Sequence, residues 1–163
     1  DVYKRQGPLG PATQPVPGQS AAESPVPPAA VSGSASTIIV EDEGSEVVDS
    51  GIPTVQGRVS VSRPVMDDPR VLGTYRLIQS GQDHGDMGPM WGTMRVENDE
   101  GAWEGPVYGY WTDTTSSASG CLAVESAHQG LPFCLQVTAD VSGFPYDVAF
   151  DGLVYQGDLP PVE

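Results

Sequence analysis

Arg95 and Glu104 form the charged pair whose spacing best suits a polar binding site. They flank a turn sequence, Asn98–Gly101, and the aromatic residues Trp91 and Tyr108 fall on the same face of the predicted hairpin. Inside the mouth of a barrel, a charged pair beside aromatic rings could hold a polar ligand. On the outer surface, the same pair would be an ion pair worth ~0–1 kcal/mol. The sequence therefore predicts these four residues as a candidate ligand site and leaves both placements open.

An acidic loop gives a second candidate site, for a metal ion. Asp83, His84 and Asp86 lie close together between two apolar runs, and Asp67 and Asp68 could join them from an earlier turn. Carboxylate and carbonyl oxygens are the ligands that calcium prefers, so Asp83 and Asp86 are candidate calcium ligands. The spacing matches no EF-hand loop, and a solvated acidic loop is the alternative interpretation.

Cys121 and Cys134 are the only cysteines, and each falls in a strand-like run. A hairpin turning at Ala127–Gly130 would place them nearly opposite one another. A disulfide between them would stabilise the fold by about 3 kcal/mol in the chain-entropy model and would indicate an oxidising compartment. Two buried free thiols remain the alternative, and a metal site would need more ligands at closer spacing.

Catalytic motifs are not found in the sequence. There is no G-x-S-x-G elbow, His84 and His128 stand alone in loops, and no glycine-rich run reads as a phosphate loop. We therefore expect no catalytic residues. Several aromatic residues fall at alternating strand positions, and core packing explains them better than a ligand-binding surface does. They are Trp103, Trp111, Phe133, Phe150 and Tyr155.

The segment Trp91–Trp111 is the clearest hairpin, and two registers compete for it. A three-residue loop would pair Val96 with Glu104, whereas a four-residue loop pairs Arg95 with Glu104 and Val96 with Trp103. Only the second register separates apolar from charged side chains, and a buried face fixes register more firmly than turn preference. We therefore expect the four-residue loop.

Other strands are predicted from alternating apolar residues at Val55–Ser62, Arg70–Gln79 and Val148–Tyr155. Thr37–Asp49 is expected to form either a short hairpin or a frayed lead-in strand. Loops are expected at Ser80–Pro89, Thr112–Ser119 and Asp140–Asp147. No segment shows the periodicity and caps of a helix. About six to eight short strands indicate an all-β fold, a small antiparallel β-barrel or, as the alternative, a β-sandwich.

The charge balance is strongly acidic, with 22 Asp and Glu against 7 Lys and Arg and a net charge of −15. This charge opposes binding to nucleic acid or to an anionic membrane surface, both of which need clustered basic residues. No apolar run approaches the length of a transmembrane segment. We expect a solvated protein whose partner, if any, is a small molecule.

The first part of the chain differs in composition from the rest. Asp1–Gln6 resembles the translation of an adapter used to prepare sequencing libraries, which predicts that the native N-terminus and any signal peptide are missing. Gly7–Ser36 is rich in Pro, Ala, Ser and Gly and is expected to be a disordered linker. Thr37–Glu163 is then a single β-barrel domain.

A set of spaced motifs resembles the signature of a group of uncharacterised exported bacterial proteins. The motifs are Met66, Asp68–Val71, Gly73-Thr74, Trp91–Thr93, Glu97–Asp99, Gly101–Gly105, Gly130-Leu131 and Phe133. The resemblance covers about Gln56 to Pro161 and implies export but no specific activity. The predicted strand order is loosely similar to the small barrels of allene oxide cyclase and dirigent proteins, whose own motifs this chain lacks, so this second likeness is an analogy.

These observations together predict a non-enzymatic, extracellular or cell-envelope β-barrel that binds a small apolar or sugar-like ligand. One alternative is an isomerase or cyclase acting inside the barrel, with Arg95 and Glu104 as its polar groups. The other is an envelope interaction module without a pocket. A cavity lined by Arg95 and Glu104 would favour ligand binding or catalysis, and an interior filled by side chains would favour the interaction module.

Overall fold

The computed structural model describes residues 27–126, 131–143 and 145–157, which form an all-β fold. The described strands are β1 (Ala29–Ala35), β2 (Ile39–Asp42), β3 (Ser45–Asp49), β4 (Ile52–Ser62), β5 (Val65–Met66), β6 (Thr74–Gln82), β7 (Met87–Asn98), β8 (Gly101–Thr112), β9 (Thr115–Ser126), β10 (Phe133–Asp140) and β11 (Asp147–Val154). The one helical element among these residues is a short 3-10 turn, η1 (Pro69–Val71).

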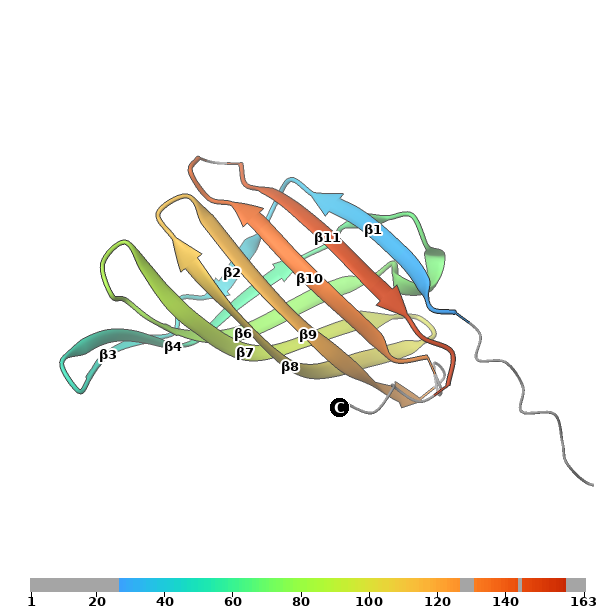
Figure 1. Ribbon diagram of the computed structural model, residues 1–163, viewed down its shortest axis with the longest axis horizontal. Coiled ribbons are helices and arrows are strands. Elements are labelled where there is room, and N and C mark those ends of the chain that lie inside the picture. The colour runs from blue at the N-terminus through green and yellow to red at the C-terminus, as the bar shows by residue number, and fades with distance from the viewer. Residues whose placement is uncertain (1–26, 127–130, 144, 158–163) are drawn as a thin grey trace, which may run out of the picture.

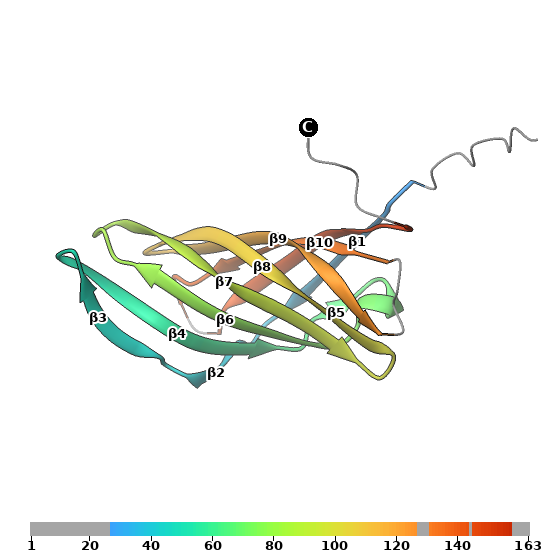
Figure 2. The ribbon, with the colours of Figure 1, turned by 90° about the horizontal axis from the view of Figure 1, so that it is seen from below.

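All the strands belong to one antiparallel sheet, in the order β2-β4-β6-β7-β8-β9-β10-β11-β1-β5, with β3 paired to β4 (Figure 1). From β6 to β11, strands that follow one another in the chain are also neighbours in the sheet, which is the arrangement that short hairpin connections allow. Seen from below, β2, β3 and β4 lie on one side of the molecule and β8, β9 and β10 on the other (Figure 2). The sheet is thus curled into a half-barrel.

Two short connections hold the ends of the sheet near one another. Residues 36–38 join β1 at one end of the sheet to β2 at the other, and residues 63–64 join β4 to β5 in the same way. A connection of three residues spans at most ~14 Å between the Cα atoms that flank it. The two ends of this ten-strand path therefore cannot lie apart as they would in a flat sheet.

Aromatic contacts across the interior show the same curvature. The ring centroids of Tyr75 on β6 and Phe150 on β11 are 5.1 Å apart, although four strands separate β6 from β11 in the sheet. Trp103 and Phe133 pack edge to face at 6.1 Å. All four side chains are buried and belong to a single hydrophobic core.

Glycine on the concave face permits this tight curl. A Cβ atom added at Gly92 would lie 2.1 Å from the carbonyl oxygen of Ile78, and one at Gly109 would lie 1.8 Å from that of Ser117. Both neighbours are backbone atoms of the adjacent strand, which cannot move aside as a flexible side chain does. The curled sheet therefore requires glycine at these positions.

The β7–β8 hairpin has the register expected from the sequence. Arg95 pairs with Glu104, and Val96 pairs with Trp103. The strands extend further than expected, to Asn98 and Gly101, so the connection itself is only two residues long. The side chain of Asn98 accepts hydrogen bonds from the backbone N–H groups of Glu100 (3.0 Å) and Gly101 (3.1 Å), which stabilises this tight turn.

Three sequence predictions about the fold are corrected by the structure. The described residues contain eleven strands rather than about six to eight, although their single curled antiparallel sheet agrees with the predicted barrel more closely than with the sandwich that was its alternative. The range Gly7–Ser36, expected to be a linker, contains β1, which pairs along its whole length with β11. The range Thr112–Ser119, expected to be a loop, lies largely in β9.

Candidate functional site

The ion pair predicted from the sequence lies on the outer surface of the sheet. Arg95 Nη1 is 3.2 Å from Glu104 Oε2, and Arg95 Nε donates to Glu97 Oε2 at 3.0 Å. Trp91 and Tyr108 pair directly across the same hairpin and are 39% and 64% exposed. Of the two placements that the sequence left open, the structure has the outer one, where such ion pairs contribute ~0–1 kcal/mol.

The predicted acidic loop is the turn between β6 and β7. Asp83 Oδ1 accepts a hydrogen bond from the backbone N–H of Gly85 at 2.8 Å, and Asp86 is exposed. Asp67 and Asp68 lie elsewhere, at η1, and have their own partners. Within the described ranges, no three His, Cys, Asp or Glu side chains are grouped so as to hold a metal ion.

The two cysteines are joined as the hairpin argument predicts. Cys121 on β9 and Cys134 on β10 are direct neighbours in the ladder, with their Cα atoms 3.9 Å apart, and they form a disulfide. The turn predicted at Ala127–Gly130, with His128, lies outside the described residues.

A large cavity occupies the concave side of the curled sheet. Its volume is about 920 Å³, and it lies toward the end of the half-barrel where the β3–β4, β6–β7 and β10–β11 connections meet. This volume is in the range of small-molecule sites, ~300–1,000 Å³. Its lining comes from strands β2 to β10 and was not identified from the sequence.

The cavity has one apolar wall and one polar wall. The apolar wall continues the hydrophobic core and comprises Met90, Trp111, Ala118, Val137, Ala139, Val141 and Tyr146. The polar wall lies on β4 and β6, where Arg58, Ser60 and Gln79 share the inner face with Leu77 and where Thr54, Ser80 and Gln82 border the cavity at neighbouring positions. Inward-facing polar side chains are costly unless they have partners, so a polar stripe opposite an apolar wall is an informative feature.

A β-bulge in β4 gives the polar wall its orientation. The register to β6 jumps from Val55–Gly81 to Arg58–Gln79, so that β4 carries one residue more than its partner, and Gly57 has a φ of 71° there. A bulge shifts the alternation of side chains by one position. As a result, Arg58 faces the cavity together with Val55.

The residue pattern did not point to this site, because the alternation along Val55–Ser62 looks unbroken. That alternation places Val55 and Arg58 on opposite faces, whereas both line the cavity. One signal was present in the sequence, since an isolated glycine inside a strand pattern, here Gly57, indicates a bulge.

The charges at the cavity have distinct positions along β4. Arg58 is the only basic side chain among the described residues of the lining, and its Nη2 is 3.6 Å from Glu43 Oε2. Two acidic residues also line the cavity: Glu46 pairs with Val55, and the backbone N–H of Asp83 bonds the carbonyl of Pro53. The acidic groups therefore lie beyond the bulge, toward the β3–β4 turn.

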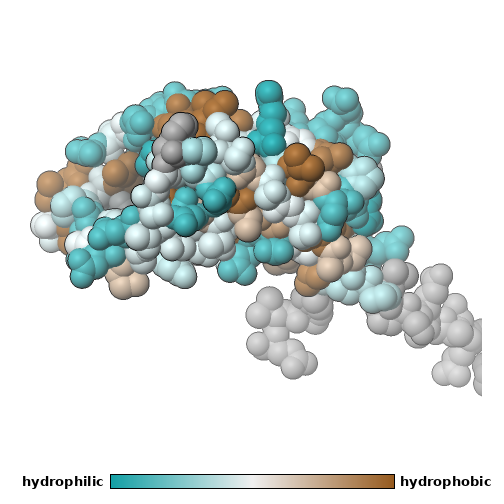
Figure 3. Space-filling view, turned by 90° about the horizontal axis from the view of Figure 1, so that it is seen from above, coloured by the Kyte–Doolittle hydropathy of each residue, from teal (hydrophilic) through white to brown (hydrophobic). Residues whose placement is uncertain are grey.

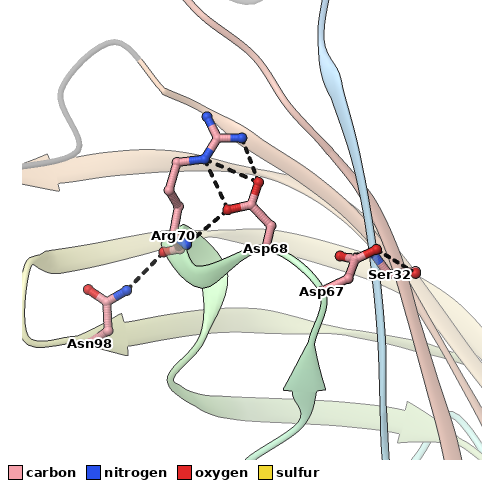
Figure 4. A network of polar contacts seen from close by, with 5 residues as sticks. All are labelled: Ser32, Asp67, Asp68, Arg70 and Asn98. Carbon is pink, nitrogen blue, oxygen red and sulfur yellow. Dashed lines mark hydrogen bonds and ion pairs between the residues drawn. The ribbon is translucent and has the colours of Figure 1, made fainter.

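Three residues of the sequence motifs, Asp68, Arg70 and Asn98, meet at the other end of the half-barrel (Figure 4). Asn98 donates to the carbonyl oxygens of Arg70 (2.9 Å) and Leu72 (3.1 Å). Arg70 in turn makes a bidentate ion pair with Asp68, with a shortest distance of 2.6 Å, and this hydrogen bond lowers the pKa of the Asp68 carboxyl group. These motif residues therefore fasten η1 to the β7–β8 turn and do not line the cavity.

Asp67 fastens the same region to β1. Its carboxylate accepts hydrogen bonds from the backbone N–H of Ser32 (2.8 Å) and from the Ser32 hydroxyl (2.9 Å), which lower the pKa of Asp67. The hydroxyl of Tyr75 donates to the carbonyl of Val71 at 2.8 Å, and burial raises the pKa of this tyrosine. This end of the molecule is thus closed by polar contacts and by a packed core.

The outer surface is mixed in character. On the face seen in Figure 3, hydrophobic residues stand in separate groups among hydrophilic ones. None of the helical structure in the described ranges is long and apolar enough to cross a membrane.

Comparison of the chain with protein-family models, with curated proteins and with solved structures finds no match.

Proposed function

We propose that this protein is a non-enzymatic binding protein that holds a small, mainly apolar molecule on the concave side of its sheet. One observation carries the proposal: a cavity of about 920 Å³ whose apolar wall is continuous with the hydrophobic core. Small-molecule sites have this character, being concave, lined mainly by apolar side chains and provided with a few polar groups.

The disulfide and the charge support an exported protein. A Cys121–Cys134 disulfide persists in oxidising compartments and is rare in the cytosol. The net charge of −15 keeps such a domain solvated. We therefore place its function outside the cytoplasm, at the cell envelope or in the medium.

The enzymatic alternative loses its geometric support. It needs Arg95 and Glu104 inside the barrel, where they could act on a bound molecule. Both side chains face the outer surface instead, where Arg95 also bonds Glu97. We therefore propose binding without chemistry.

The proposal can be tested with a neutral fluorescent probe, N-phenyl-1-naphthylamine, whose emission rises in apolar surroundings. We expect the wild-type protein to bind the probe with a saturable signal. Val137→Trp should weaken binding because the larger side chain fills the cavity that Val137 lines. Ala149→Trp is the matched control, because Ala149 is exposed on β11.

The comparison is made between variants whose urea unfolding midpoints match that of the wild type. If the wild type shows no saturable signal, or if Val137→Trp and Ala149→Trp bind the probe equally well, the proposal is wrong. The second result would place the probe on the outer surface.

A further inference from the structure

Arg58 is a cation on the inner side of the sheet. Unbroken alternation after Val55 would turn its side chain outward, and the bulge at Gly57 brings it to the cavity instead. In the ladder it stands beside Gln79, which also lines the cavity. A bulge of this kind is a common device for aiming a side chain at a site.

The existing partner of Arg58 leaves its hydrogen-bonding capacity largely unused. Its ion pair with Glu43 spans 3.6 Å, longer than a hydrogen bond, and the Glu43 side chain is 78% exposed. An ion pair of that kind is weak in water. The guanidinium group carries five N–H donors in a planar fork that matches both oxygens of a carboxylate.

The surroundings of Arg58 favour a ligand whose polar head group and apolar tail contact opposite walls of the cavity. Gln79 and Ser60 offer further hydrogen bonds beside the guanidinium group, and the apolar wall with Met90 and Val137 lies opposite. The acidic Glu46 pairs with Val55, three residues along β4 and so ~10 Å away. The nearest carboxylate is that of the exposed Glu43, so a negative head group at Arg58 would take the place of Glu43 as its partner, while Glu46 stays at a distance.

The overall negative charge does not exclude such a ligand. The net charge of −15 repels an anion at long range. At physiological ionic strength, charges farther away than ~8 Å are largely screened, so Arg58 and its weakly held, exposed partner Glu43 decide the preference inside the cavity.

We propose that the ligand is an amphipathic carboxylate, with its carboxylate bound by Arg58 and its apolar chain against the Met90–Val137 wall. This inference rests on the proposed function and adds the chemical class of the ligand to it. It also explains the polar wall, whose role would otherwise be unassigned.

The test compares decanoate with 1-decanol, which have the same apolar chain and differ in the head group. Each displaces N-phenyl-1-naphthylamine from the wild-type protein, from Arg58→Gln and from Arg58→Lys. We expect decanoate to bind the wild type about tenfold more tightly than decanol, and Arg58→Gln to remove that preference. Arg58→Lys should keep part of it, because an ammonium group keeps the charge without the planar fork.

Arg95→Gln is the matched control, since it removes an arginine from the outer face. We expect this variant to retain the wild-type preference for decanoate. An equal loss in Arg95→Gln and Arg58→Gln would overturn the inference, because the effect would then come from net charge alone.

The possible failures are distinguishable. Equal binding of decanoate and decanol by the wild type, or an unchanged preference in both Arg58 variants, overturns the inference and leaves the proposed function standing. Displacement of the probe by neither compound, in a protein with wild-type unfolding, counts against both.

Discussion

Trp103 and Trp91 show how one hairpin places the same residue type in two environments. Trp103 is fully buried, its Nε1 donates to the carbonyl of Leu131 at 2.7 Å, and its ring packs against Phe133. Trp91 is 39% exposed on the opposite face. Strand side chains alternate between faces, so the register alone decides which ring is buried.

We therefore expect Trp103→Ala to lower the free energy of unfolding by ~3–5 kcal/mol, because it leaves a large cavity and an unpaired carbonyl. Trp91→Ala should cost much less, since its ring keeps contact with water in the folded state. Urea unfolding of the two variants measures the difference. Equal and large losses would mean that both rings support the core.

Asp67 and Asp68 predict how acid destabilises the molecule. Hydrogen bonds from Ser32 to Asp67, and from Arg70 to Asp68, lower the pKa of each carboxyl group in the folded protein. The unfolded chain therefore binds protons at a higher pH than the folded protein does. The stabilisation is present above the ordinary aspartate pKa and is lost as the pH falls through the lowered folded values.

The matching prediction concerns Asp67→Ala. It should be less stable than the wild type at neutral pH, and the difference should shrink between about pH 5 and pH 2 as the wild type loses the contribution. Urea unfolding at a series of pH values measures this. Asp86→Ala, in the β6–β7 turn, is the control for removing one negative charge. A difference that stays constant across the series would contradict the prediction.

At the scale of elements, the sequence predicts best where one face of a hairpin is apolar. The β7–β8 register follows from the burial of Val96 and Trp103, and the Cys121–Cys134 pairing follows from hairpin symmetry. In both cases, a one-residue slip would expose the core, so the pattern leaves one register.

The elements that were missed lack such a pattern. β1 reads Ala-Ala-Val-Ser-Gly-Ser-Ala, and β9 begins with Thr-Ser-Ser-Ala-Ser-Gly, so neither has the bulky side chains that usually indicate strands. The polar wall was missed for another reason, since a bulge shifts alternation without changing composition.

The glycine residues on the concave face lead to a prediction about what the curvature of the sheet requires. Replacing a strand glycine by alanine ordinarily stabilises by roughly 0.5–1 kcal/mol through the unfolded chain. At Gly109 the new Cβ would lie 1.8 Å from the Ser117 carbonyl oxygen, so we expect Gly109→Ala to destabilise by ~1–3 kcal/mol instead.

Gly143 provides the control, because a Cβ there would meet nothing within 4 Å. Gly143→Ala should leave the urea midpoint unchanged or raise it slightly. If Gly109→Ala behaved in the same way, the sheet would have room to flatten, and the curl would not depend on glycine at that position.

At the scale of the whole molecule, the two ends of the half-barrel have different roles. One end holds the buried aromatic core and the contacts of η1 with Ser32 and Asn98. The other end holds the cavity, bordered by the β3–β4, β6–β7 and β10–β11 connections. Because Asp68, Arg70 and Asn98 lie at the closed end, they stabilise the fold, and the choice of ligand depends on the cavity lining.

β1 sets the N-terminal boundary of the folded domain. It pairs with β11 along its whole length, pairs with β5, and buries Val31. Without it, β11 would become an open edge, and Asp67 would lose the hydrogen bonds from Ser32. The folded domain therefore needs β1, although its composition resembles that of a linker.

Two truncations test this boundary. A chain that starts at Pro27 should unfold in urea at the wild-type midpoint, because it keeps every strand of the sheet. A chain that starts at Thr37 should lose stability severely or fail to unfold cooperatively. Val31→Asp in the full-length chain should also destabilise strongly, because it places a charge in the core without shortening the chain. A chain from Thr37 with wild-type stability would show that the sheet closes without β1 and that the linker predicted from the sequence extends to Ser36.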